Sequence, residues 1–140
     1  MNLLIKKISK YKHLVYKNIE LPIISSSLKE ALSTLEEPVV HPFYIISKDG
    51  IFIRNQYAWD GATYVLNDSK YLRIPSLIHD VGCQAVNNHL LDHSFRKHFD
   101  GEYFELSLLY NPFKNKIMTC LIFLRACLHF TFIRLWGMIP

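Results

Sequence analysis

The amino-acid sequence predicts one small α+β domain, in which a β-hairpin packs against three or four helices, two of them forming an αα-hairpin. The first observation is size: 140 residues, half of them apolar, suffice for one hydrophobic core but not for two. The second is a pair of β-branched and aromatic runs around a turn, within residues 39–59. The third is a series of helix-start signals in the second half of the chain.

The first elements are a basic arm and a short helix. Residues 1–24 are basic and irregular, so we expect an N-terminal arm in front of a domain that spans residues 25–140. Ser27-Leu-Lys-Glu30 has the pattern of a capping box and predicts a helix that ends near Glu37.

The hairpin and the helical pair follow. The runs VVHPFYIIS and IFIRNQYAW flank a turn with Asp49-Gly50, and Pro42 is expected at an edge or a bulge because it cannot donate to a ladder. Pro75 suits the first turn of a helix that runs to the turn at Asn87-Asn88, and a second helix is expected to start near Asp92 or Ser94 and to end at Asn111-Pro112.

The most apolar stretch is residues 117–136, which are long enough to cross a bilayer but carry Arg125 at the centre. A central arginine costs at least ~2.5 kcal/mol on insertion, so we expect a core helix and no membrane span. Its apolar stripe is expected to pack inside the domain and comprises Leu121, Leu124, Leu128 and Phe132. The alternative is a helix that lies in a membrane interface.

Charge is unevenly distributed along the chain. All 12 acidic residues lie between Glu20 and Glu105, so residues 1–17 carry +5, residues 18–110 carry −5 and residues 111–140 carry +4. Basic ends point to an anionic partner such as lipid headgroups, nucleic acid or an acidic subunit, unless the first lysines form only a solvated arm. The start of the chain lacks the apolar segment of a signal peptide, which favours a cytoplasmic location.

Several function classes are excluded by what the sequence lacks. Three cysteines, none in a C-x-x-C pair, argue against a disulfide scaffold and a zinc ribbon. There is no phosphate-binding glycine loop, no G-x-S-x-G and no helix-turn-helix, so we expect no sequence-specific nucleic-acid binding. The spacing of His89 and His93 suits a metal, but the predicted turn breaks that helix.

The candidate chemistry lies in a cluster of ionisable residues. If the helical hairpin folds near residues 89 and 90, His79 and Asp100 are equidistant from the turn and face each other. A carboxylate on one imidazole nitrogen fixes the tautomer and leaves the other nitrogen as a general base. Asp80 would then face Asp60, and two carboxylates with loop carbonyls suit a calcium-like divalent cation. Alternatively the cluster is structural: Arg96 pairs with Asp100, and Asp60 bonds its own turn.

The order of these motifs resembles the domain of unknown function 1353 family of tailed phages and prophages, over roughly residues 50–137. The matching residues are Trp59, Asp60, Gly61, Ala62, Thr63, His79, Asp80, Arg96, Asp100, Arg134 and Gly137. The resemblance implies a phage or prophage origin, hence a location in the host cytoplasm or the virion, and no established activity. The family usually has Tyr four residues after the His, where this chain has Cys83.

A second resemblance concerns the site alone. In phospholipase A2 a helical His is the base, the adjacent Asp binds calcium and a distant Asp orients the His, which would assign these roles to His79, Asp80 and Asp100. This chain lacks the cysteine framework and the glycine-rich calcium loop of that enzyme. We therefore expect either a metal-assisted hydrolase acting on a cell-envelope ester or amide, or a non-catalytic virion or host-interaction protein.

Overall fold

The computed structural model describes residues 13–60 and 71–110, together with Leu124, Leu128 and Thr131. This part of the chain contains two antiparallel sheets and three α-helices, so the α+β class is confirmed. The strands are β1 (His13–Leu14), β2 (Ile19–Leu21), β3 (Val39–His41), β4 (Tyr44–Ser47), β5 (Gly50–Ile53) and β6 (Ala58–Trp59). The helices are α1 (Ser26–Ser33), α2 (Arg73–Asn87) and α3 (Arg96–Leu109), with a 3₁₀ turn η1 (His93–Phe95) before α3.

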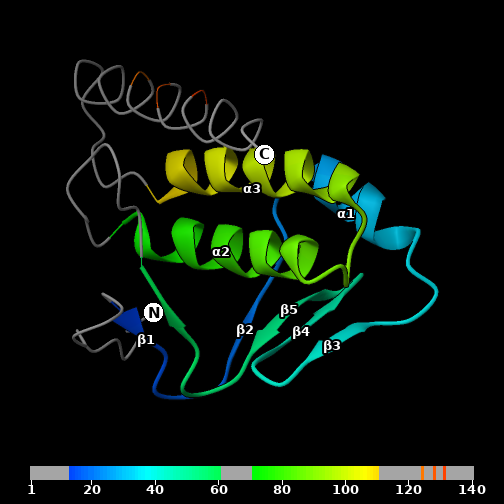
Figure 1. Ribbon diagram of the computed structural model, residues 1–140. Helices are drawn as coiled ribbons and strands as arrows, with labels where there is room; N and C mark the ends of the chain where they lie inside the picture. Colours follow the sequence, from blue (N-terminus) through cyan, green and yellow to red (C-terminus); the bar gives the residue numbers. More distant parts are fainter. Residues whose placement is uncertain (1–12, 61–70, 111–123, 125–127, 129–130, 132–140) are drawn as a thin grey trace.

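The elements form layers (Figure 1). A four-stranded sheet of order β2-β5-β4-β3 lies below α2, and α3 lies on the other side of α2. Tyr44 and Ile46 of β4 are buried and alternate with less buried neighbours, as expected for a sheet with one covered face. Ten of the 15 residues of α2 are buried because this helix is covered by the sheet and by α3. The core therefore runs through α2.

The predicted hairpin is present, but each of its two runs is divided. The first run forms β3 and β4, which pair through a turn at Pro42-Phe43. Pro42 lies in that turn and not in a strand, because its fixed φ suits a turn and the missing N–H costs nothing there. The second run forms β5, then turns at Gln56, whose φ is 68°, before β6.

Part of the expected N-terminal arm belongs to the sheets. Strand β2 pairs with β5 and strand β1 pairs with β6, so residues 13–24 are built into the fold. Leu21 and Ile23 are buried in the core, and their burial holds this stretch against the neighbouring strands despite Pro22. Residues 1–12 lie outside the described part of the chain.

The start of α1 differs from the predicted capping box. The N-cap is Ser25, whose Oγ accepts a hydrogen bond from the Leu28 N–H at 3.2 Å, and the helix ends at Ser33, before Glu37. This register buries Leu28 and Leu32 completely. The helix thus follows the apolar spacing i, i+4 rather than the Ser27/Glu30 pattern.

The helical hairpin agrees with the sequence prediction. Pro75 lies in the first turn of α2, and the side chain of Asp92 accepts from the Ser94 N–H at 2.8 Å to open η1 and α3. The two helices approach closely at Gly82, where a Cβ atom would lie 2.2 Å from a ring carbon of Phe99. This glycine allows α2 and α3 to pack closely enough for short polar side chains to meet.

The C-terminal stretch is described only at Leu124, Leu128 and Thr131, all helical. The prediction that its apolar stripe packs inside the domain is wrong for the two leucines, which are 54% and 63% exposed. Helical periodicity correctly placed them on one face but gave no information on what that face contacts. None of the described helices is long and apolar enough to cross a membrane.

Candidate functional site

His79 on α2 and Asp100 on α3 form a buried pair. The imidazole Nε2 lies 3.0 Å from Asp100 Oδ1, and the residues are 9% and 2% exposed. This contact confirms the position expected from a hairpin folded near residues 89 and 90. A carboxylate at this distance fixes the ring orientation and holds a proton on Nε2.

The other side of the imidazole faces a more open region. Asp80 Oδ1 lies 3.8 Å from His79 Nδ1, and the Asp80 side chain is one-third exposed. The ring of Tyr103 meets the imidazole edge to face, with centroids 5.6 Å apart, and closes the site on the α3 side. Nδ1 therefore faces Asp80, the more exposed of the two acidic neighbours of the ring.

Cys83 is a neighbour of the imidazole that the sequence analysis did not identify as a site residue. Its Sγ lies 3.8 Å from His79 Nδ1 and 3.6 Å from His79 Nε2. The signal was present in the sequence, because residues i and i+4 of a helix share one face. Its nearly equal distance from both nitrogens places the sulfur away from the in-plane direction of either lone pair.

These neighbours determine the charge of His79. Burial by itself lowers the pKa of the imidazole, because it disfavours the charged ring. Cys83, Asp100 and Asp80 together outweigh burial and raise the pKa of His79 well above 6.5. These neighbours therefore favour the protonated form of the imidazole.

Trp59 brings the end of β6 to α2. Its indole Nε1 donates to Ser76 Oγ over 3.2 Å, and the Ser76 hydroxyl donates to the Arg73 carbonyl at 3.0 Å. Ser76 is one helical turn before Asp80, so this anchor positions Asp60, which follows Trp59, beside the same face of α2. Trp59 is thus a structural member of the site.

Burial and neighbouring charges shift the pKa of Asp80. Burial raises the pKa of Asp80 above 3.8 and Asp60 raises it further, whereas His79 and His13 lower it. The ring of His13 lies against Trp59, with centroids 4.9 Å apart, so strand β1 contributes to this region. Asp60 is therefore one of the charges that act on Asp80.

Within residues 13–60 and 71–110, no group of three or more His, Cys, Asp or Glu side chains is arranged to hold a metal ion. Gly61, Ala62 and Thr63, whose loop was expected to supply carbonyl ligands, lie outside the described residues. Of the expected cation ligands, the described residues therefore include the carboxylates of Asp60 and Asp80.

The alternative pairing of Arg96 with Asp100 is not among the ion pairs described for residues 13–60 and 71–110. Arg96 lies one turn before Asp100 on α3, but its Nε is buried without a hydrogen-bond partner among the described residues. The ion pair described for Asp100 is with His79.

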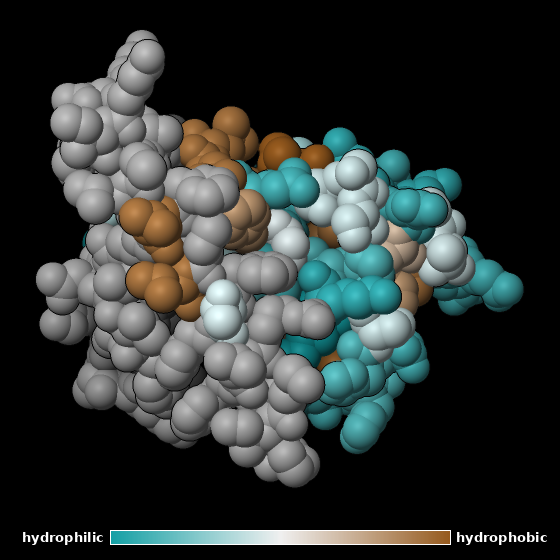
Figure 2. Space-filling view, turned by 90° about the horizontal axis from the view of Figure 1, so that it is seen from above, coloured by the Kyte–Doolittle hydropathy of each residue, from teal (hydrophilic) through white to brown (hydrophobic). Residues whose placement is uncertain are grey.

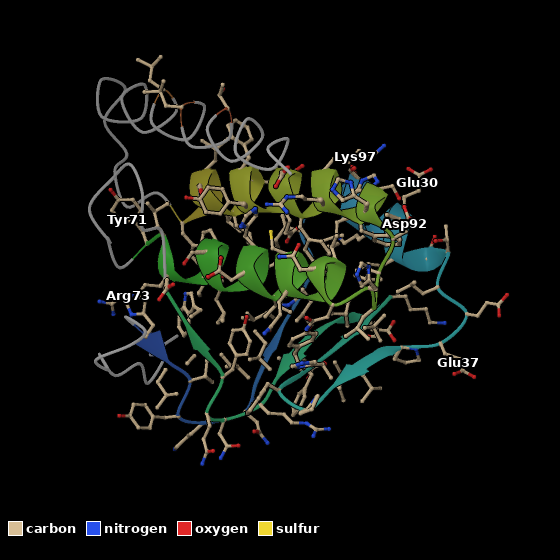
Figure 3. All side chains as sticks on the ribbon, in the orientation of Figure 1. Glu30, Glu37, Tyr71, Arg73, Asp92 and Lys97 are labelled. Carbon is tan, nitrogen blue, oxygen red and sulfur yellow. The ribbon has the colours of Figure 1, made fainter. Side chains whose placement is uncertain are left out.

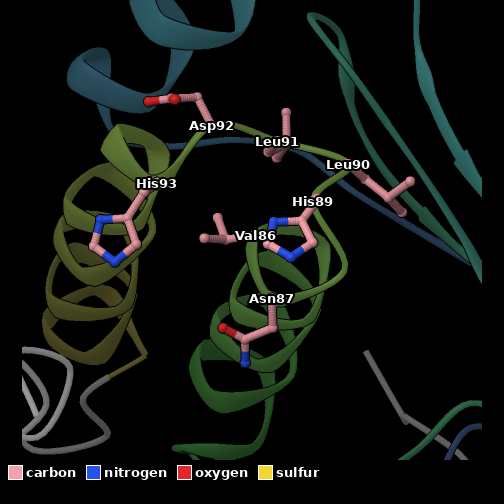
Figure 4. Close-up of a pocket in the computed structure, with 7 residues that line it drawn as sticks. All are labelled: Val86, Asn87, His89, Leu90, Leu91, Asp92 and His93. Carbon is pink, nitrogen blue, oxygen red and sulfur yellow. The ribbon is translucent and has the colours of Figure 1, made fainter. Parts of the chain in front are cut away.

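Figure 3 labels Arg73 at one end of α2 and Asp92 beyond the other end, and two further histidines lie close to Asp92 in the sequence. His89 and His93 line an open hollow at the hairpin turn, with Val86 on the floor between them (Figure 4). Helix α2 ends at Asn87 and His89 has a φ of 58°, so the two imidazoles are not on one helix, as expected from the predicted turn. This hollow is separate from the His79 site.

Comparison with known proteins identified no relative of this chain. No family model, no curated protein and no solved structure matches this chain.

Proposed function

We propose that this protein is a small phage-encoded hydrolase that cleaves an ester or amide of the bacterial cell envelope. His79 is the general base and Asp100 is the carboxylate that orients it. The observation that carries the proposal is the 3.0 Å contact of Nε2 with Asp100, which leaves Nδ1 on the side of the partly exposed Asp80. The phage origin is supported by the motif order described above.

Water is the nucleophile in this proposal. A thiol that donates its proton to an imidazole must lie along the lone pair of one nitrogen, much closer to that nitrogen than to the other. Cys83 Sγ lies at 3.8 and 3.6 Å from the two, and the nearer nitrogen is already bonded to Asp100. Cys83 therefore packs against the ring and takes no part in the proton transfer.

A divalent cation of the calcium type would be held by Asp60 and Asp80, with oxygen ligands that such ions prefer. Its chemistry would be to polarise the carbonyl that the water attacks. The arrangement is supported by the charge of Asp60, which raises the pKa of Asp80 and so acts on the same region of the site.

The raised pKa of His79 sets a condition for this chemistry. A protonated imidazole cannot accept a proton from water, so the base becomes available only as the pH rises through the pKa of the ring. We therefore expect the rate to increase from neutral towards alkaline pH.

The experiment incubates the full chain with purified peptidoglycan and, separately, with phosphatidylglycerol vesicles, at pH 6 to 10 with and without calcium. We expect soluble fragments or free fatty acid, lost by roughly 100-fold or more in His79→Gln and Asp100→Asn. Cys83→Ala is the matched variant on the same ring and should keep its activity if water is the nucleophile. Absence of product from both polymers and lipids across this range would reject the hydrolase.

A second candidate function is a non-catalytic virion or host-interaction protein. The observation that favours it is the burial of both partners of the His79–Asp100 pair, which is what a link between two helices requires. In that case the pair stabilises the fold and variants at either residue lower the melting temperature.

A further inference from the structure

Two leucines of the C-terminal helix are open to solvent. Leu124 and Leu128 are 54% and 63% exposed and lie one helical turn apart, so they share a face. Figure 2 looks down on the side of the molecule where α3 lies, and its apolar residues gather towards one end while the α1 end is hydrophilic. Leu109, at the end of α3, is also exposed.

The segment that carries Leu124 and Leu128 has charge of one sign in its sequence. Residues 111–140 contain Lys114, Lys116, Arg125 and Arg134 and no Asp or Glu. An occupant of the leucine face must therefore offer an apolar phase next to negative charge.

We propose that the leucine face, Leu124 and Leu128, docks on the surface of a membrane that contains anionic lipid. The negative headgroups complement the positive charge of residues 111–140, and the acyl boundary accepts the leucine side chains. A second copy of the chain fits less well, because a two-fold contact through this face would bring two +4 segments together. Arg125 lies next to Leu124 in the sequence and favours a helix that rests in the interface over one that crosses it.

The number of exposed leucines fixes what kind of binding is expected. Two leucine side chains bury little apolar area, comparable to a weak, reversible anchor, and stable attachment needs a second signal. The lysines and arginines supply that signal only against negative headgroups and only at low salt. Binding must therefore require both the leucines and the anionic lipid.

The test is flotation of the full chain with vesicles of phosphatidylcholine containing 30% phosphatidylglycerol, and with phosphatidylcholine alone. We expect flotation with the first vesicles at 0.1 M salt, and a drop of at least tenfold in the partition coefficient at 0.5 M salt or without the anionic lipid. The double variant Leu124→Asp, Leu128→Asp should lose tenfold or more. Val40→Asp is the matched control, since Val40 on strand β3 is also 63% exposed.

Three results would overturn the proposal. The first is no flotation of the unmodified chain with anionic vesicles. The second is an equal loss in Val40→Asp and in the double variant, with unchanged circular dichroism in both. The third is a dimer in solution, measured by light scattering, that the double variant abolishes, because the occupant would then be a second copy. None of these measurements depends on hydrolytic activity, so their outcome is independent of the function proposed above.

Discussion

The Glu102 carboxylate of α3 accepts the backbone N–H of Ser25 at the start of α1, 77 residues earlier, over 2.7 Å. Its second oxygen accepts the N–H of Ile24 at 2.8 Å. In a capping box a glutamate within the helix performs this task for the N-cap residue. Here the carboxylate comes from another helix, so the same interaction caps α1 and fixes α1 to α3.

Replacement of Glu102 by alanine is expected to destabilise the protein by about 2 kcal/mol. Two N–H groups lose their acceptors, which costs roughly 1 to 3 kcal/mol each. Part of this loss is offset, because burial raises the pKa of Glu102 and the ionised carboxylate is itself costly there. Chemical denaturation measures the change, and Glu105→Ala, at an exposed position on the same helix, should stay within about 0.5 kcal/mol.

The close approach of α2 and α3 predicts opposite effects for two glycines. Gly82→Ala places a methyl group 2.2 Å from the fully buried ring of Phe99, and we expect a loss of about 1 to 3 kcal/mol from overpacking. Gly101→Ala on α3 meets nothing within 4 Å and should stabilise the helix by up to about 1 kcal/mol. Melting temperatures that move in the same direction would contradict this packing.

The stability of His79→Ala and Asp100→Ala separates the two candidate functions. A structural pair leaves an uncompensated buried group in either variant, so both should lose on the order of 1 to 3 kcal/mol. His93→Ala, at an exposed imidazole, serves as the control. Activity that the unmodified chain has and both variants lose would support the hydrolase, whereas large losses of stability in both variants of a chain without any activity would support the structural role.

The pH dependence of stability follows from the raised pKa of His79. The unfolded chain releases this proton near the ordinary value of 6.5, whereas the folded chain retains it to higher pH. The stabilisation is therefore complete below pH 6.5 and is lost as the pH rises through the folded pKa. Thermal scans from pH 6 to 10 should show this decline, and His79→Gln should flatten it. A profile identical in both proteins would be inconsistent with a charged pair.

Calcium is expected to raise the melting temperature if Asp60 and Asp80 hold a cation. At a concentration 100-fold above the dissociation constant, ligand binding adds about 2.7 kcal/mol to the free energy of unfolding. Asp60→Asn and Asp80→Asn should each remove the effect. The cation is ruled out if 10 mM calcium leaves the melting temperature of the unmodified protein unchanged.

The sequence was sufficient where local rules decide the structure. The position of the turn between two helices determines which residues face each other, so the contact of His79 with Asp100 could be counted from the chain. Trp59 was a candidate by motif, but its bond to Ser76 could not be predicted, because it depends on how β6 packs on α2.

The predictions from sequence were wrong where contacts between distant parts of the chain determine the structure. Ser27 and Glu30 satisfy a local capping pattern, but the buried leucines and Glu102 move the start of α1 to Ser26. Likewise, the spacing of Leu124 and Leu128 identifies a face without identifying its neighbour. Hydrophobic periodicity is a property of one helix and can be read from its sequence, whereas the burial of its side chains depends on a second element that covers them.

The contact between Ser25 and Glu102 also constrains the order in which the chain matures during synthesis. Translation proceeds from the N-terminus, so α1 emerges from the ribosome well before the residue that completes its cap. Strands β2 to β5 have all their pairing partners within the first 53 residues and do not wait for α3. We therefore expect nascent chains that end before residue 102 to contain a formed sheet and a frayed α1, which α3 secures as the last step.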